Sequence, residues 1–485
     1  MGRIAVTARS GAPEDTAADT RVVGLFEGES LPNARLQALV DLGEAKPGLK
    51  KVAVTHEEAP GGGQRRVLIA GLGKREELDP ERARVAAGAA AGRAKELGSV
   101  SLSWAEPPGG RVAGALVEGT LLRLYSFERF KSQREEDGDD GIESLEIAGD
   151  AVDGDEVDRA RVSANAANAA RDLQNLPSNV ATPTFLAERA AEIAAQHDAL
   201  EVELLDREAI VARGMGALAS VAQGTYAEPR MIVLRYRPSG ASGPHLGYVG
   251  KAVTFDTGGI SIKPSSKMHE MKFDMSGGAA VIEAMDGIAQ LGVPATITAV
   301  VPSTENMPSG RSVKPGDIVT AMNGKTIEVN NTDAEGRLIL ADALCYATEQ
   351  GVERVVDLAT LTGAILVALG HTYAGLFSND DAWYAEVEAA CDASGEAGWR
   401  LPLHPEFLEL TKGQYADLTN ASEQRVAMSC YAAEFLRQFV DERPWVHMDI
   451  AGTAWGTSRN YVGKGASGFG TRALIELARR SSAAG

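Results

Sequence analysis

The chain has 485 residues, of which 44% are hydrophobic and 24% are charged, and its formal net charge is -19. This length exceeds what one ordinary hydrophobic core holds, so we expect two domains of a globular protein. The negative charge disfavours nucleic acids and anionic membranes as partners, and no apolar run reaches the roughly 18 residues that a membrane-spanning helix needs.

Residues 1–155 predict a small α/β domain. Short β-like runs such as "RRVLIAGLG" precede an alanine-rich helical stretch, "DPERARVAAGAAAGRAKELG". The acidic stretch that follows, residues 134–158, is predicted to be an exposed connection or an edge of this domain, because it is rich in like charges and has no aromatic residue.

A helical segment over residues 156–185 is predicted to link this domain to a larger one, residues 186–485. The sequence "LPSN" interrupts the helical pattern, and Thr182 is a suitable N-cap for the helix that follows. From there β-like runs such as "MIVLRYRP", "ATITAVVPS" and "WVHMDIAG" alternate with helical ones. The alternation predicts a mixed sheet flanked by helices, a fold in which ligands gather at the carboxyl ends of strands.

Two segments of the larger domain place charged residues in apolar surroundings. They are "VGKAVTFDTGGISIKPSSKMHEMKFDM", residues 249–275, and "VNNTDAEGRLILADAL", residues 329–344. Four carboxylates in them could supply oxygen ligands for two divalent ions that share and activate a water: Asp256, Asp274, Asp333 and Glu335. Asp333 and Glu335 point the same way only if "NTDAEG" is a strand or loop, with a helix that starts near Gly336.

The alternative is a set of ordinary ion pairs and helix caps, with Lys251 paired to Asp274. Other motifs are missing from the sequence: it has no HExxH or CxxC pattern, no P-loop and no nucleophile elbow. The seven histidines do not cluster, and the three scattered cysteines argue against a disulfide framework.

The segment "NTDAEGRL", residues 331–338, resembles the signature octapeptide of the leucyl aminopeptidase (cytosol aminopeptidase) family of dinuclear metallopeptidases. The segments "VGKAVTFDTGGISIKPSSKMHEMKFDM", "DLATLTGAILVALG", "YAGLFSND" and "WVHMDIAGTAW" resemble further blocks of that family, in the same order. The resemblance extends over about residues 160–480. It implies a metal-dependent exopeptidase that releases leucine and other, mainly apolar, N-terminal residues from short peptides through a metal-bridging hydroxide.

The resemblance also implies roles for matching residues. Two ions, Mn²⁺ or Zn²⁺, would bind. The ligands of one would be Lys251, Asp256, Asp274 and Glu335, and those of the other would be Asp256, Asp333 and Glu335. Lys263 would stabilise the charge that develops on the scissile carbonyl. Arg337 would hold a bicarbonate ion as general base, since a guanidinium matches a planar anion. The free α-amine of the substrate would bind one metal and Asp274.

Further matching positions would contact the substrate. The residues that would align the peptide backbone are Thr360, Leu361 and Gly363, and those that would line the pocket for the first side chain are Met271, Asn331, Ala451 and Ala454. The chain departs from the family pattern at Ala454, where some relatives have methionine, and at Ala252 and Lys267, where glycine is usual.

The resemblance implies a homohexamer with enclosed active sites. Some bacterial relatives also bind DNA, but the net charge of -19 argues against that role here. A two-metal phosphoesterase is a third possibility, although such sites usually include histidine ligands. The amino-terminal stretch lacks a hydrophobic signal segment, so we expect a cytoplasmic protein.

Overall fold

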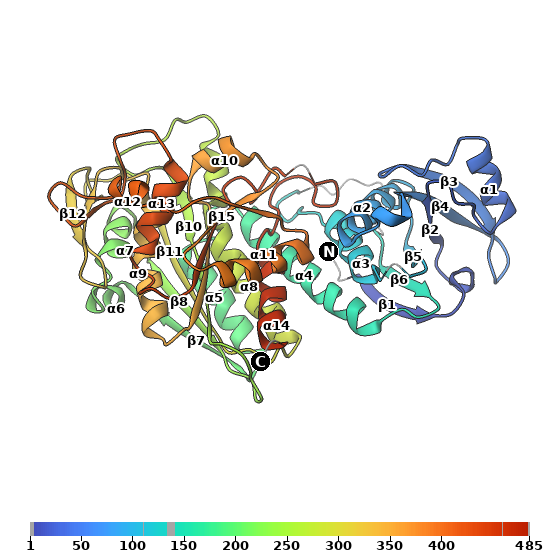
Figure 1. Ribbon diagram of the computed structural model, residues 1–485, viewed down its shortest axis with the longest axis horizontal. Helices are drawn as coiled ribbons and strands as arrows, with labels where there is room; N and C mark the ends of the chain where they lie inside the picture. The colour runs from blue at the N-terminus through green and yellow to red at the C-terminus, as the bar shows by residue number, and fades with distance from the viewer. Residues whose placement is uncertain (1–3, 110, 133–140, 458, 484–485) are drawn as a thin grey trace. The chain divides into compact units, whose positions relative to one another are not determined.

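The computed structural model describes residues 4–109, 111–132, 141–457 and 459–483 (Figure 1). The chain forms two compact units. Unit 1 comprises Met1–Asn168 and Ser458–Gly463, and unit 2 comprises Ala169–Thr457 and Lys464–Gly485. Within the described residues, no helix combines the length and the apolar character that crossing a bilayer requires.

Unit 1 is built on a six-stranded sheet in which only β3 runs antiparallel to its neighbour. The strand order is β1-β6-β5-β2-β4-β3. The strands are β1 (Ala5–Ser10), β2 (Thr20–Phe26), β3 (Val52–Glu58), β4 (Gln64–Gly73), β5 (Ser101–Ala105) and β6 (Ser144–Gly149), and the helices are α1 (Ala34–Asp41), α2 (Pro80–Glu96) and α3 (Ala113–Leu124). The alanine-rich stretch forms α2, as predicted. Gly119 of α3 lets that helix approach α2 closely, because a Cβ on it would lie only 2.3 Å from the carbonyl oxygen of Arg84.

The prediction for the acidic stretch is wrong in its second half. Residues 144–149 form β6, which lies between β1 and β5 inside the sheet. Leu145 and Ile147 alternate with polar residues and are fully buried, so a period-two pattern outweighs the acidic composition around it. Residues 133–140 of that stretch lie outside the described residues.

The predicted linking segment, residues 156–185, contains most of α4 (Gly154–Asn175) and the first residues of α5 (Pro183–Ala194). The hydroxyl of Thr182 accepts a hydrogen bond from the backbone N–H of Phe185 at 3.2 Å. This confirms Thr182 as the N-cap, a contact that satisfies one of the free N–H groups of the first turn.

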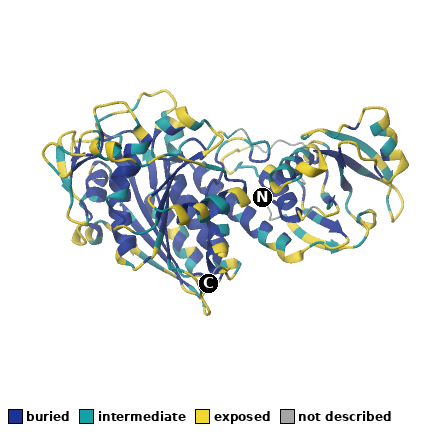
Figure 2. Cartoon of the chain, in the orientation of Figure 1, coloured by how far each residue is buried: buried dark blue, intermediate teal, exposed yellow. Residues whose placement is uncertain are grey.

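Unit 2 contains a nine-stranded mixed sheet of order β16-β15-β18-β14-β9-β11-β8-β7, with β10 also paired to β11. Its strands are β7 (Leu200–Leu205), β8 (Arg230–Tyr236), β9 (Leu246–Gly250), β10 (Ala252–Asp256), β11 (Ile297–Asn306), β14 (Arg354–Ala359), β15 (Ala374–Ser378), β16 (Gly398–Arg400) and β18 (Trp445–Asp449). The central strands β9, β14, β18, β10 and β11 run parallel to their neighbours in this group. They are almost fully buried (Figure 2), as expected of parallel strands covered on both faces.

Helices cover both faces of this sheet. Besides α4 and α5, the helices of unit 2 are α6 (Arg207–Ala212), α7 (Gly216–Val221), α8 (Ser276–Gln290), α9 (Glu335–Glu349), α10 (Gly363–Leu369), α11 (Asp381–Ser394), α12 (Pro405–Glu409), α13 (Met428–Arg437) and α14 (Thr471–Ala483). Adjacent residues of β9 identify the two layers, because successive side chains of a strand point to opposite faces. Tyr248 donates a hydrogen bond to the carbonyl of Leu474 on α14, whereas Val249 packs in one cluster with Leu338 of α9.

A smaller three-stranded sheet belongs to the same unit. Its order is β12-β13-β17, from Asp317–Thr320, Thr326–Val329 and Leu418–Thr419. The predicted architecture, a small N-terminal α/β domain joined by a helix to a larger domain with a mixed sheet flanked by helices, is confirmed.

Candidate metal centre

The predicted metal ligands come from three segments at the carboxyl ends of the central strands of unit 2. Lys251 separates β9 from β10, and Asp256 ends β10. Asp274 lies on a 3-10 helix, Met268–Met275, directly before α8. Asp333 lies on the loop before α9, and Glu335 is the first residue of that helix.

Glycines allow α8 to begin directly against the kinked strand at Lys251. The Lys251 N–H donates to the carbonyl of Leu358 on β14 at 3.0 Å, and the N–H of Gly278 donates to the Lys251 carbonyl at 2.7 Å. A Cβ on Gly277 would lie 2.1 Å from the Leu358 carbonyl oxygen, and one on Gly250 would lie 2.5 Å from that of Gly277. Any larger residue would push the helix and the strand apart and move the charged side chains that they carry.

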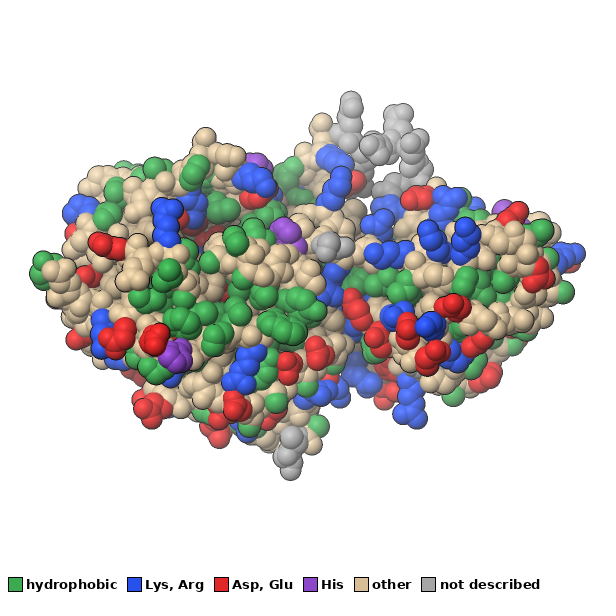
Figure 3. Space-filling view, turned by 45° about the horizontal axis from the view of Figure 1, so that its top comes forward, with side chains coloured by type: hydrophobic (Ala, Val, Ile, Leu, Met, Phe, Trp, Pro, Cys, Tyr) green, Lys and Arg blue, Asp and Glu red, His purple; other side chains and the backbone are tan. Residues whose placement is uncertain are grey.

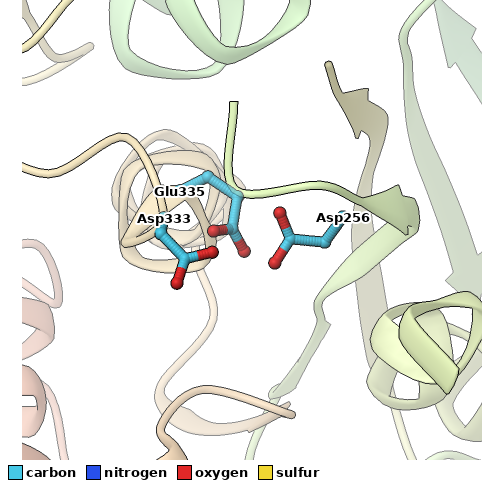
Figure 4. Close-up of side chains that lie close together, drawn as sticks. All are labelled: Asp256, Asp333 and Glu335. Atoms are coloured by element: carbon cyan, nitrogen blue, oxygen red, sulfur yellow. The ribbon is translucent and has the colours of Figure 1, made fainter. Parts of the chain in front are cut away.

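The carboxylates of Asp256, Asp333 and Glu335 converge, as Figure 4 shows. One oxygen from each lies within 4.8 Å of the others. Lys263, from the loop after β10, pairs with Asp256 at 2.7 Å and with Asp333. Together with Lys251 and Asp274, described next, these residues form one cluster that contains all four predicted carboxylates and both predicted lysines.

Lys251 joins the remaining acid to this cluster. Its ammonium lies 2.8 Å from Asp274 Oδ1 and 2.7 Å from Glu335 Oε1, and it donates to the Thr360 carbonyl at 2.9 Å. The ion pair between Lys251 and Asp274, named above as the simpler alternative, is thus present, but as part of a larger network.

The loop that carries Asp333 has the predicted irregular backbone. The side chain of Asn331 accepts a hydrogen bond from the Asp333 N–H at 2.9 Å, which bends the chain before α9. The helix starts at Glu335, one residue before the expected Gly336. Asp333 therefore projects from the loop and Glu335 from the first turn, toward the same point.

The charges in the cluster are unbalanced, with four carboxylates against two ammonium groups. Burial raises the pKa of Asp256 to about 6, with repulsion from Glu335 adding to the rise, and burial raises the pKa of Asp274 well above its ordinary value. Burial also acts to raise the pKa of Glu335, but Lys251 and Lys263 outweigh it and lower that pKa. Burial acts to lower the pKa of Lys251, yet Asp274 and Glu335 raise it. Burial raises the pKa of Asp333 as well. Three of the four acids are thus driven toward their neutral forms, because the cluster has too little positive charge.

Two buried oxygen atoms show that the cluster fits a cation. Asp274 Oδ2 and Glu335 Oε2 have no hydrogen-bond partner among the described residues. A buried carboxylate oxygen without a donor is costly, unless a cation or a bound ligand interacts with it. Carboxylate oxygens are also the donors that hard divalent ions prefer. The residues present therefore suit divalent metal binding.

Arg337 lies in the first turn of α9, close in sequence to Glu335. It is buried, lies over the ring of Tyr431 at 5.2 Å and donates from Nη1 to the carbonyl of Asn420. Its Nε is buried and has no hydrogen-bond partner among the described residues. One N–H of the guanidinium is therefore available for an anion.

Two predicted substrate residues are held by one buried acid, Asp449, at the end of β18. Its Oδ1 accepts hydrogen bonds from the N–H groups of Leu361 at 3.2 Å and Ala451 at 3.3 Å. The hydroxyl of Thr360 donates to Asp274 Oδ1 at 2.7 Å, which connects this loop to the carboxylate cluster. Gly363 follows as the first residue of α10.

The other predicted pocket residues lie on adjoining segments. Met271 is on the 3-10 helix Met268–Met275, whose Phe273 stacks on Trp455, the residue after Ala454, with ring centroids 5.3 Å apart. Asn331 lies on the loop before α9, where its side chain caps the Asp333 N–H.

Three residues that position the site were not predicted. Asp449 ends an apolar strand as Asp256 does, so the same signal was present in "WVHMDIAG". Asn306 donates from its side chain to Asp256 Oδ1 at 2.8 Å and to the Thr332 carbonyl at 3.0 Å. Asn420 contacts the loop before α9. Neither asparagine stands in a periodic or charged pattern, so local sequence gave no signal for them.

A buried cluster of carboxylates and lysines at the carboxyl ends of the strands of an α/β unit, suited to divalent cations, is typical of metallohydrolases. The profile of the cytosol aminopeptidase family, catalytic domain, matches residues 168–475, and that of the family's N-terminal domain matches residues 22–134. The chain therefore belongs to the cytosol aminopeptidase family, whose members are metallo-exopeptidases.

Individual relatives agree with this membership. A probable cytosol aminopeptidase of Solibacter usitatus (strain Ellin6076) is 46% identical over 95% of this chain and 96% of its own. One of Roseiflexus castenholzii (strain DSM 13941 / HLO8) is 43% identical over 98% of this chain and 99% of its own. The solved structure of the bottromycin maturation enzyme BotP in complex with Mn has a TM-score of 0.86 at 33% identity, covering 96% of this chain and 100% of that one.

Proposed function

We propose that this chain is a metal-dependent aminopeptidase that releases leucine and other, mainly apolar, N-terminal residues from short peptides. The observation that carries the proposal is the pair of buried, unpartnered oxygens, Asp274 Oδ2 and Glu335 Oε2, in a cluster with excess negative charge. Family membership and the Mn-bound relative support it.

Two divalent ions, Mn²⁺ or Zn²⁺, are proposed to bind here. One would be held by Lys251, Asp256, Asp274 and Glu335, and the other by Asp256, Asp333 and Glu335. When bound, such ions lower the pKa of a shared water and polarise the scissile carbonyl. Lys251 would have to give up its proton to become a ligand, which the charge of a nearby dication favours.

The chain's own residues would do the rest of the chemistry. Lys263, whose pKa Asp256 and Glu335 raise despite its burial, stays cationic and donates a hydrogen bond to the carbonyl oxygen as negative charge develops there. Arg337 holds bicarbonate as general base, and its free Nε–H supplies a donor. Asp274 accepts a hydrogen bond from the α-amine of the substrate, so a blocked N-terminus would not bind.

The substrate would lie along the loop that Asp449 supports. Thr360, Leu361 and Gly363 would align its backbone. The first side chain would enter a pocket lined by Met271, Asn331, Ala451 and Ala454. The small Ala454 leaves room for bulky apolar residues, which supports a preference beyond leucine alone.

A homohexamer and a cytoplasmic location complete the proposal. Figure 3 shows hydrophobic side chains gathered over the visible face of the larger unit. The exposed apolar residues of unit 2 include Val367, 89% exposed, and Trp399, 57% exposed, and apolar surface of this kind supports self-association. The relatives' name, cytosol aminopeptidase, supports the location.

The test is direct. The purified protein is stripped with EDTA, supplied with Mn²⁺ or Zn²⁺, and assayed on leucyl and other aminoacyl peptides beside their N-acetylated forms. We expect metal-dependent release of the first residue from free peptides only. Absence of release from every unblocked peptide, or equal cleavage of acetylated ones, would refute the proposal. Activity on aryl phosphates alone would indicate a phosphoesterase.

A further inference from the structure

Asn420 is a fully buried residue directly after β17, and its side chain contacts the loop before α9 on both sides of Asp333. Its Oδ1 accepts hydrogen bonds from the N–H groups of Asn330 at 2.9 Å and Asn331 at 3.2 Å. Its Nδ2 donates to the carbonyls of Asn331 at 2.7 Å and Ala334 at 3.3 Å. One side chain therefore holds four backbone groups of the loop that carries Asp333.

The backbone of Asn420 connects two more parts of the site. Its N–H donates to the carbonyl of Glu328 on β13 at 2.9 Å, which anchors it to the three-stranded sheet. Its carbonyl accepts the hydrogen bond from Arg337 Nη1. Loop, sheet and guanidinium thus meet at a single residue.

The four contacts require an amide. A carboxamide offers an acceptor oxygen and two donor hydrogens at once, whereas an ionised carboxylate only accepts. Ala334, whose carbonyl is one of the acceptors, lies between Asp333 and Glu335, so its position sets the separation of those two carboxylates. Functional constellations tolerate displacements of only about 0.5 Å, so a loop freed at this point would no longer present both acids to one ion.

We propose that Asn420 is a positioning residue that fixes the loop before α9, so that Asp333 and Glu335 face the same divalent cation, and that orients Arg337. The proposal rests on the proposed function for the identity of the cation site. It predicts that Asn420 controls metal affinity without touching the metal, since residues behind the ligands of metal sites typically change affinity 10–100-fold.

The first test is Asn420→Asp in the full-length chain. The variant keeps the size of the side chain and its accepted hydrogen bonds, but it loses both donated ones and places negative charge against the carbonyls of Asn331 and Ala334. We expect the Kd for Mn²⁺, measured by isothermal titration calorimetry, to rise about 10–100-fold. Activity should fall at limiting Mn²⁺ and recover substantially at saturating Mn²⁺.

Asn420→Ala is the second variant, because it removes all four side-chain contacts without adding a charge that could prevent folding. Asn379→Asp is the matched control. Asn379 also bridges backbone groups of unit 2, donating to the Arg443 carbonyl at 2.9 Å and accepting from the Trp445 N–H at 2.8 Å, but it contacts no predicted ligand. It should leave the Kd for Mn²⁺ within about twofold, even if stability changes. Circular dichroism of all three variants establishes that they fold.

The outcomes separate the two proposals. If both folded Asn420 variants bind Mn²⁺ as the unchanged protein does, the positioning role is wrong and the proposed function stands. If Asn379→Asp weakens Mn²⁺ binding equally, the effect is general loss of stability, and the positioning role is also wrong. An unchanged protein that binds Mn²⁺ but cleaves no peptide refutes the proposed function alone. One that binds no divalent metal refutes both.

Discussion

Replacing Gly336 by alanine tests whether Lys251 is held in its buried ion pairs. Gly336 is the second residue of α9, and a Cβ there would lie 2.7 Å from Lys251 Nζ and 2.8 Å from Cε. The ammonium would have to move, although it is only 2% exposed and pairs with Asp274 and Glu335. Breaking a buried ion pair costs about 3–5 kcal/mol, whereas glycine to alanine inside a helix gains about 1 kcal/mol. We therefore expect Gly336→Ala to lower the free energy of unfolding by about 2–4 kcal/mol.

The measurement is urea unfolding in EDTA, followed by tryptophan fluorescence. Gly363→Ala is the control for stability, because Gly363 also lies at the start of a helix of unit 2 but has nothing within 4 Å of its Cβ position. This control should be neutral or gain up to about 1 kcal/mol. If Gly336→Ala is as stable as the unchanged protein, the ammonium moves freely, and the description of Lys251 as locked between two carboxylates is refuted.

Three further changes probe chemistry, backbone strain and pH dependence. Lys263→Met should lower kcat about 10²–10³-fold without weakening Mn²⁺ binding, since Lys263 is proposed to contact the substrate and not the metal. Steady-state kinetics measure kcat, and calorimetry measures the Kd for Mn²⁺. A loss of Mn²⁺ affinity that parallels the loss of kcat would contradict this role. Lys267→Gly should raise the free energy of unfolding by about 0.5–1 kcal/mol, because the exposed Lys267 has a left-handed backbone with φ of 61°; a loss of stability in urea would contradict it. Asp342, buried on α9, accepts hydrogen bonds from the N–H groups of Leu218 and Met322, and burial raises its pKa from 3.8 to about 7. The pKa of Asp342 is higher in the folded protein than in the unfolded chain. Its contribution to the free energy of unfolding, roughly 4 kcal/mol, is therefore present below about pH 4 and is lost as the pH rises to about 7. Asp342→Asn should flatten the pH dependence of the free energy of unfolding in urea titrations between about pH 4 and 8, and an unchanged slope would refute this prediction.

The parts of the fold that the sequence predicts are those with strong local patterns. The alanine-rich α2, the Thr182 cap and the alternation of strands and helices in unit 2 all follow from periodicity and capping over a few residues. The carboxylates of the site were found for a related reason, because charge beside buried apolar runs is costly and calls for an explanation.

The features that were missed depend on contacts between distant residues. Strand β6 is a sheet strand because β1 and β5 pair with it from more than 130 and more than 40 residues away, respectively, and nothing in an acidic stretch shows those partners. Only Lys251 separates β9 from β10. Its N–H donates to the Leu358 carbonyl of β14, a long-range contact that the local sequence does not show. Asn420 acts on a loop about 90 residues earlier in the chain, so its role exists only in the folded protein.

The same long-range contacts explain how unit 2 stays folded despite the repulsion among the clustered acids of its active site. Four acids that converge in a buried place repel one another, and Lys251 and Lys263 compensate only part of that repulsion. A bound divalent cation would supply the missing positive charge, and because the unfolded chain has no such site, the binding free energy would add to the stability of unit 2. The residues that hold the acids together in the absence of metal are therefore under a double constraint. They must keep the carboxylates close enough to share a cation, and they must do so against a repulsion that only the cation fully relieves. Uncharged side chains that bind backbone, such as those of Asn306 and Asn420, satisfy both demands, since they fix the loops without adding a charge that would compete with the metal.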